Sequence, residues 1–225
     1  MGAFVLLAVA LLLATACGGG GGDTAAADPT EEPKVTVAGD SISVGLGASL
    51  REAVDDGVVV KVIGSGGTGL ARPDNFDWPA RFEELARDFP PEVLVLSLGS
   101  NDAQDLADGG GGTVATMADE DGWDEEYRAR LARSFDAFAD TGTRVVWVGH
   151  VRTEDDLVAD TNRRVHELAT EVAASRDWVQ VEDLAELTGS GADSPSDCLI
   201  SDGLHLSVEC YGTAAEALAD RLGPV

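Results

Sequence analysis

The sequence predicts a single α/β domain built on a parallel sheet with helices on both faces. From residue 34 onward, short apolar segments rich in β-branched residues alternate with longer segments of helical periodicity. The apolar segments show little polar alternation, which is typical of strands buried on both faces. Hydrophobic residues make up 44% of the 225 residues, enough for a core despite a formal net charge of −26.

The boundaries of the elements follow from this alternation. Strands are expected at 34–38, 58–63, 93–98, 144–148 and 178–181. Helices are expected at 42–53, 79–88, 124–140, 157–175 and 208–222. Ligands bind such sheets at the carboxyl ends of the strands, where the strand order reverses. Functional residues are therefore expected directly after the strands.

The N-terminus resembles an export signal. Residues 3–16 form an uncharged apolar run, shorter than the ~20 residues that a membrane-spanning helix needs. The run ends in Ala-Thr-Ala before Cys17, which resembles the lipobox of bacterial lipoproteins, where Cys17 would be lipidated. Ala14 stands where leucine is commoner, and no Lys or Arg precedes the run. A plain cleaved signal peptide and a spanning anchor are the alternatives.

We therefore expect three parts: a signal peptide and lipobox at 1–17, a flexible tether at 18–33 and one folded domain at 34–225. The folded domain is expected outside the cytoplasm, lipid-anchored to the outer face of the cell membrane or otherwise secreted. The acidic charge argues against nucleic acid and anionic lipid as partners, because phosphates would be repelled. The membrane is expected as a partner only through the anchor at Cys17.

Two segments after predicted strands carry candidate functional residues. Ser41 follows the first strand, where a serine is also a common helix N-cap. Residues 64–69 follow the second strand and match the dinucleotide-binding pattern G-x-G-x-x-G. That pattern requires a helix opening directly from the glycines, which Pro73 disfavours. A glycine loop can equally present a bare backbone N–H to an oxyanion.

Two further segments complete the set. Asn101 follows the third strand, where asparagine often forms a turn but its amide can also donate into a cleft. Asp202 and His205 lie three residues apart, directly before the last predicted helix. At this spacing a carboxylate can hold one imidazole nitrogen while the other faces a nucleophile. An Asp-Gly turn followed by a surface histidine is the simpler interpretation.

Taken in order, these four segments resemble the blocks of the SGNH (GDSL-type) hydrolase superfamily, over nearly all of residues 35–222. Within it, residues 68–79 look like an exported bacterial subgroup of poorly defined substrate. The resemblance implies a three-layer αβα sandwich with a five-stranded parallel sheet in the flavodoxin-like arrangement. The G-x-S-x-G elbow of the α/β-hydrolases is absent around Ser41.

The resemblance also implies roles for the residues. Ser41 would be the nucleophile, His205 its general base and then acid, and Asp202 the group that orients the imidazole. The backbone N–H groups of Ser41 and Gly67 and the amide of Asn101 would form the oxyanion hole. A one-residue slip of the block would put Gly66 in place of Gly67.

No cofactor is implied, and the sequence carries no metal-binding signature. The acidic segment 119–122 falls short of a calcium loop and is interpreted as a solvated turn. Segment 103–122, with four consecutive glycines, is either a lid over the site or a disordered insertion.

Several side chains are candidates for substrate contact. They are Arg72, Phe76, Trp78, His150 and Arg152. The first three follow the glycine loop and the last two follow the fourth strand. Each has an ordinary role in loop packing as its alternative.

The cysteines are consistent with an oxidising compartment. If Cys17 is lipidated, Cys198 and Cys210 remain, and they bracket Asp202 and His205. A disulfide between them would join the catalytic loop to the last helix.

The favoured function is an extracytoplasmic serine esterase that acts on acyl or O-acetyl esters through an acyl-enzyme. Its substrate would be a small-molecule or carbohydrate ester. The alternatives are an O-acyltransferase on cell-wall or extracellular carbohydrate and a non-catalytic binding lipoprotein.

Overall fold

The computed structural model describes residues 34–149, 151–189 and 197–225. The predicted signal segment, Cys17 and the tether lie outside these ranges, as does His150. Within the described ranges, none of the helices combines the length and apolarity that crossing a bilayer requires.

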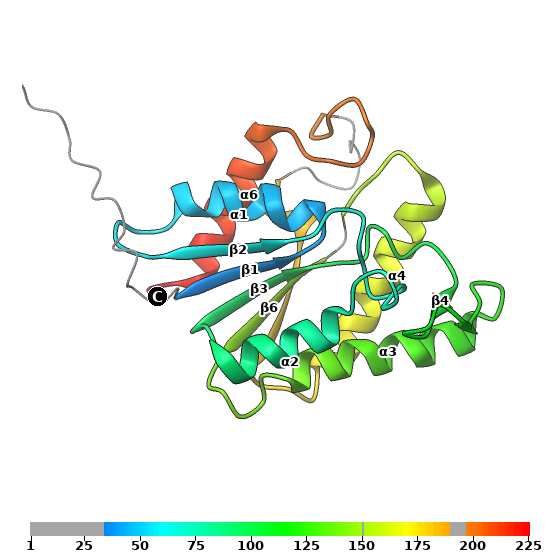
Figure 1. Ribbon diagram of the computed structural model, residues 1–225. Coiled ribbons are helices and arrows are strands. Elements are labelled where there is room, and N and C mark those ends of the chain that lie inside the picture. The colour runs from blue at the N-terminus through cyan, green and yellow to red at the C-terminus, as the bar shows by residue number, and fades with distance from the viewer. Residues whose placement is uncertain (1–33, 150, 190–196) are drawn as a thin grey trace, which may run out of the picture.

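Five parallel strands form the central sheet in the order β2-β1-β3-β6-β7 (Figure 1). They are β1 Val35–Gly39, β2 Val60–Gly64, β3 Val93–Ser97, β6 Arg144–Gly149 and β7 Val179–Asp183. The chain passes from β1 to β2 on one side and then returns to β3 on the other, so the strand order reverses at β1. This confirms the predicted fold class and puts the expected binding crevice at the carboxyl ends of β1 and β3.

Helices cover both faces of the sheet. One face carries α1 Ser41–Ala53, the short α5 Leu184–Leu187 and α6 Val208–Leu222. The other carries α2 Trp78–Asp88, α3 Glu120–Asp136 and α4 Asp156–Ala173. Each face has its own buried apolar cluster, and Figure 1 shows the two helical layers on opposite sides of the strands. Helix α6 coincides with its predicted range, whereas α5 was not expected.

Helix α3 begins four residues earlier than predicted. The side chain of Asp119 accepts a hydrogen bond from the backbone N–H of Gly122, which caps the helix. Glu120 and Asp121 occupy the first turn, where negative charge interacts favourably with the helix dipole. The acidic segment is therefore the start of α3 and not the expected turn, although it is exposed to solvent as that expectation implied.

Segment 103–122 contains a small antiparallel hairpin of β4 Leu106–Ala107 and β5 Thr113–Ala115. The N–H of Ala107 donates to the carbonyl oxygen of Ala71 at 2.9 Å, and its carbonyl accepts from Arg130 at 2.7 Å. The expectation of a disordered insertion was therefore wrong, because these contacts tie the hairpin to the rest of the domain. A lid role for the segment stays a prediction.

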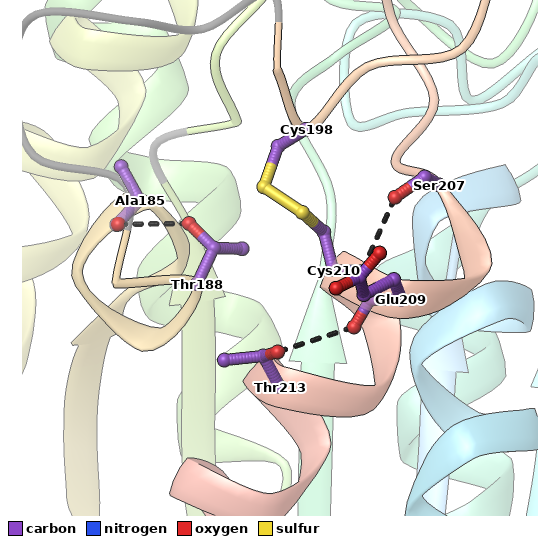
Figure 2. The surroundings of a disulfide bond; sticks show 7 residues. All are labelled: Ala185, Thr188, Cys198, Ser207, Glu209, Cys210 and Thr213. Atoms are coloured by element: carbon purple, nitrogen blue, oxygen red, sulfur yellow. Dashed lines mark hydrogen bonds between the residues drawn. A yellow bond between two sulfur atoms is a disulfide. The ribbon is translucent and has the colours of Figure 1, made fainter.

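Cys198 and Cys210 form a disulfide bond, as predicted, with their Cα atoms 5.6 Å apart. Figure 2 shows the bond joining the segment before α6 to the first turn of α6. In the same turn the hydroxyl of Ser207 accepts from the N–H of Cys210 and caps the helix. The bond therefore encloses the loop that carries Asp202 and His205.

Thiol chemistry tests this bond. Without reductant, alkylation followed by peptide mass mapping is expected to find neither Cys198 nor Cys210 modified. Reduction is expected to lower the free energy of unfolding by about 3 kcal/mol or less, the chain-entropy value for so short a loop. Full alkylation of both cysteines in the unreduced, folded protein would contradict the pairing.

Candidate active site

Ser41 lies at the junction between β1 and α1. Gly39 precedes it with a φ of 140°, and a Cβ atom there would lie 1.9 Å from the carbonyl oxygen of Ser97 on β3. Only glycine fits this close approach of the two strands. The side chain of Asp40 caps α1, its Oδ1 atom accepting from the N–H of Ile42 at 2.9 Å. Ser41 is thus the first helical residue, where its own N–H has no partner within the helix and the helix dipole is positive.

A tight loop presents Asp202 and His205. The N–H of Ser207 donates to the carbonyl oxygen of Cys198, and the N–H of Ile200 donates to that of His205, so the loop closes on itself. Within it, one oxygen of Asp202 accepts the backbone N–H groups of Leu204 and His205.

The loop is also fixed from outside. The carbonyl oxygen of Gly203 accepts from the N–H of Glu154 at 2.9 Å and from the hydroxyl of Thr153 at 2.8 Å. These bonds join the loop to the segment after β6. Gly203 has a φ of 70°, a left-handed conformation that glycine adopts readily.

The three predicted catalytic side chains meet in one hydrogen-bonded chain. The Oγ atom of Ser41 lies 2.7 Å from Nε2 of His205, and Nδ1 of His205 lies 2.8 Å from Oδ2 of Asp202. Because a carboxylate can only accept, Nδ1 carries the proton and Nε2 is left to accept from the serine hydroxyl. This arrangement has the connectivity of a serine–histidine–aspartate triad.

Hydrogen bonds keep Asp202 ionised. The N–H of His205, the N–H of Leu204 and the His205 side chain, in that order of effect, lower the pKa of Asp202 to about 2. Asp202 is therefore a carboxylate at any pH above that value, although its side chain is 45% exposed to solvent. The ionised carboxylate can therefore orient the imidazole and stabilise an imidazolium at any pH above about 2.

The glycine loop after β2 borders Ser41 on the other side. A Cβ atom added to Gly66 would lie 3.8 Å from Cβ of Ser41, whereas one added to Gly67 would meet no atom within 4 Å. Gly67 has a left-handed φ of 72°. The amide of Asn101 reaches this loop and donates to the carbonyl oxygen of Thr68 at 2.9 Å. The residues predicted to form an oxyanion hole therefore lie together, and both glycines stay candidates for the backbone donor.

A buried carboxylate that sequence reasoning missed holds this side of the site together. Asp102 accepts the backbone N–H groups of Leu70 and Ala71 at 3.0 and 2.8 Å, and the hydroxyl of Tyr127 at 2.7 Å. A Cβ atom on Gly69 would clash with its carboxylate at 2.0 Å. Asp102 therefore ties the segment after the glycine loop to the segment that carries Asn101. The Gly-Ser-Asn-Asp motif contains it, but only the tertiary contacts show this role.

Burial raises the pKa of Asp102, and hydrogen bonds from Tyr127 and the two backbone donors oppose that effect. Burial, followed by the charge of Asp102, also raises the pKa of Tyr127 well above its usual value near 10. The phenol therefore stays a hydrogen-bond donor at neutral pH. Arg130 completes the cluster by donating to the carbonyl oxygens of Leu70 and Ala71.

The prediction that Trp78 contacts substrate was wrong. Its side chain is completely buried, stacked against Phe82, and its indole N–H donates to the hydroxyl of Thr68 at 2.9 Å. Trp78 thus supports the glycine loop from beneath. An aromatic residue at the start of an amphipathic helix signals burial as readily as substrate contact.

The other candidate contacts are placed as follows. Arg72 is partly exposed and pairs with Asp74 at 2.6 Å. Phe76 lies against Trp78, with ring centroids 4.6 Å apart. Arg152 lines a small cavity beside Cys198. Their contact with substrate stays a prediction, and His150 lies outside the described residues.

The glycine loop is not followed by the helix that dinucleotide binding requires. After β2 ends at Gly64 the chain runs through turns until α2 begins at Trp78. Among the described residues, no cluster of three or more His, Cys, Asp or Glu side chains is arranged to hold a metal ion.

Solved structures with the same fold were found by comparison. Est24, a carbohydrate acetylesterase from Sinorhizobium meliloti, superposes with a TM-score of 0.59 at 15% identity, covering 85% of this chain and 98% of that one. A protein from Slackia heliotrinireducens described as "a putative SGNH hydrolase" superposes with a TM-score of 0.60 at 19% identity, covering 86% of this chain and 100% of that one. The salicylyl-acyltransferase SsfX3 from a tetracycline biosynthetic pathway superposes with a TM-score of 0.60 at 18% identity, covering 87% of this chain and 55% of that one.

These likenesses confirm the SGNH-hydrolase fold that the ordered motifs predicted. No curated protein matches the chain. A family model described as "Protein of unknown function (DUF459)" matches residues 34–214, which include β1, the glycine loop, Asn101 and the Asp202–His205 loop. The chain therefore belongs to this family and has the fold of the SGNH hydrolases.

Proposed function

We propose that this protein is a serine esterase that hydrolyses carboxylic esters through an acyl-enzyme. The observation that carries the proposal is the hydrogen-bonded chain from Ser41 through His205 to Asp202. A serine hydroxyl is a weak nucleophile at neutral pH unless a base removes its proton during attack. Nε2 of His205 is 2.7 Å away and oriented to accept that proton.

The reaction has two steps. Oγ of Ser41 bonds to the ester carbonyl carbon while its proton passes to Nε2 of His205, and the imidazolium then protonates the departing alcohol. Water attacks the acyl-enzyme by the same route and releases the carboxylic acid and free Ser41. In each step the negative charge on the carbonyl oxygen is stabilised by the N–H of Ser41, a glycine N–H of the loop and the amide of Asn101.

O-acetyl groups on carbohydrate are the proposed substrate class, with short-chain acyl esters as the alternative. Support comes from the shared fold of Est24, which is described as a carbohydrate acetylesterase. The proposed location is outside the cytoplasm, with a lipid anchor at Cys17. The Cys198–Cys210 bond supports this location, because disulfides persist in oxidising compartments.

An O-acyltransferase is the second candidate, favoured by the shared fold of the salicylyl-acyltransferase. In that case a sugar hydroxyl, in place of water, would resolve the acyl-enzyme. Product analysis with a carbohydrate acceptor present distinguishes the two. A purely binding role is disfavoured because three separately encoded side chains lie in hydrogen-bonding order.

Removing the nucleophile tests the proposal. A fluorophosphonate probe is expected to label the wild-type protein but not Ser41→Ala, and ester hydrolysis by Ser41→Ala is expected to fall by at least ~10³-fold. Ser43→Ala is the matched control, because the Ser43 hydroxyl is on the same helix but is buried against the carbonyl oxygen of Asp40. A folded wild-type protein that resists the probe and hydrolyses no ester would refute the proposal.

The acid side of the pH profile tests the base. As the pH is lowered, kcat/KM is expected to fall, with a limiting slope of about tenfold per pH unit, because a protonated imidazole cannot accept the serine proton. Asp202, with its pKa of about 2, stays ionised and does not contribute to this decline. The measurement is kcat/KM from pH 4 to 7, and a profile flat down to pH 4 would exclude histidine as the base.

The amide of Asn101 is expected to stabilise the transition state more than the bound substrate. Asn101→Ala should lower kcat by ~10²–10³-fold, the usual effect of losing one oxyanion donor, with little change in KM. Asn75→Ala, on the exposed turn before α2, is the control. Equal activity of Asn101→Ala and the wild-type protein would rule Asn101 out as a donor.

A further inference from the structure

The proposed mechanism gives Asp40, the residue before the nucleophile, no part in the reaction. Asp40 precedes Ser41 and is completely buried. Its Oδ1 atom caps α1, and its Oδ2 atom lies 3.4 Å from the amide nitrogen of Asn101. Asparagine can cap a helix as well as aspartate does. The capping bond alone therefore does not require an ionisable group beside the nucleophile.

The contact of Asp40 with Asn101 involves the side-chain amide that is proposed to donate to the oxyanion. A side-chain amide has two N–H groups. In Asn101 one of them donates to the carbonyl oxygen of Thr68 at 2.9 Å, and the amide nitrogen's other contact is Oδ2 of Asp40. An oxyanion formed at Ser41 would need that second N–H. Asp40 and the oxyanion therefore compete for one hydrogen atom.

The charge of Asp40 decides this competition. A carboxylate accepts hydrogen bonds about twice as strongly as a neutral oxygen, so ionised Asp40 would retain the amide. A second negative charge beside the developing oxyanion would also raise the energy of the transition state, and burial weakens the solvent screening of that repulsion. Protonation of Asp40 weakens the competing hydrogen bond and removes the charge repulsion.

We propose that Asp40 is a positioning residue that leaves the Asn101 amide available to the oxyanion only when its carboxyl group is protonated. Ionisation of Asp40 then lowers the esterase rate on the alkaline side without displacing Ser41 or His205. This inference rests on the proposed esterase function and deepens it.

The surroundings of Asp40 favour the neutral form near neutral pH. Burial raises its pKa to about 7 and the negative charge of Asp102 adds to this effect, while backbone hydrogen bonds, that of Ile42 first, oppose it. The charge of Asp40 also acts on two tyrosine side chains, Tyr127 of α3 and Tyr211 of α6, and raises the pKa of each. Burial raises the pKa of Tyr211 to about 12 and that of Tyr127 well above its usual value near 10, so both phenols stay neutral near neutral pH.

His205 and Asp202 are the remaining ionisable groups of the site. Asp202 keeps its charge above pH 2. His205 must be neutral to act as a base, so it cannot cause a loss of rate as the pH rises, whereas ionisation of a buried carboxyl group, Asp40 or Asp102, can. Replacing Asp40 alone distinguishes these two carboxyl groups.

The test compares wild-type protein, Asp40→Asn and Asp119→Asn from pH 5 to 9.5. Asparagine retains the helix cap and is permanently neutral. Asp119 caps α3 from an exposed position and serves as the control. Above about pH 7, kcat of the wild-type protein and Asp119→Asn is expected to fall by up to tenfold per pH unit, whereas Asp40→Asn keeps its rate. KM is expected to change little in all three.

Three results would overturn the inference. They are an alkaline decline of the same midpoint and depth in Asp40→Asn, an active wild-type protein with no decline up to pH 9.5, and a folded Asp40→Asn that is inactive at every pH. An inactive wild-type protein whose Ser41 also resists the fluorophosphonate probe would instead refute the esterase function.

Urea unfolding tests the ionisation without any activity. A carboxyl group whose pKa is raised on folding holds its proton in the folded state between pH 4 and 7 but loses it in the unfolded state. Stability is then lost as pH rises through this window. Asp40→Asn is therefore expected to become more stable relative to the wild-type protein between pH 4.5 and 7.5. A stability difference independent of pH would show that Asp40 does not titrate there and would overturn the inference.

Discussion

The hydrogen bond between Ser41 and His205 is the interaction on which the site depends, and it joins residues 164 positions apart. Ser41 is fixed because β1 is an inner strand of the sheet, paired with β2 and β3, and Asp40 caps the helix that follows. His205 is fixed because its loop closes on itself and is joined by the disulfide to α6. Helices α1 and α6 pack against each other on the same face of the sheet, which brings the two ends of the domain together.

The opposite side of the crevice depends on buried polar contacts. Asp102 joins the segment after the glycine loop to the segment after β3, and Tyr127 of α3 satisfies the same carboxylate. A buried carboxylate is costly unless it is hydrogen-bonded, so this cluster favours one arrangement of the two loops. Trp78 adds a bond to Thr68, whose carbonyl oxygen in turn holds Asn101. The Asn101 amide is thus oriented through Thr68 by a buried side chain of α2.

The five strands and the helices between them could be predicted from the sequence because burial on both faces leaves a strong apolar pattern. The start of α3 was misplaced because Asp119 and Glu120 look like a polar loop until the capping bond is seen. The site residues were found because each directly follows a strand or precedes the last helix. The roles of Trp78 and Asp102 depend on contacts distant in sequence, with Thr68 and with Leu70 and Tyr127, which no local pattern encodes.

The central claim is that Ser41 becomes acylated with the help of His205. The most direct measurement is mass spectrometry of the protein quenched in acid during turnover of an activated acetyl ester. The account predicts one acetyl group on the peptide that contains Ser41, and none on that peptide in His205→Ala over the same time. Ester turnover with no adduct on Ser41, or with the acyl group on another residue, would contradict it.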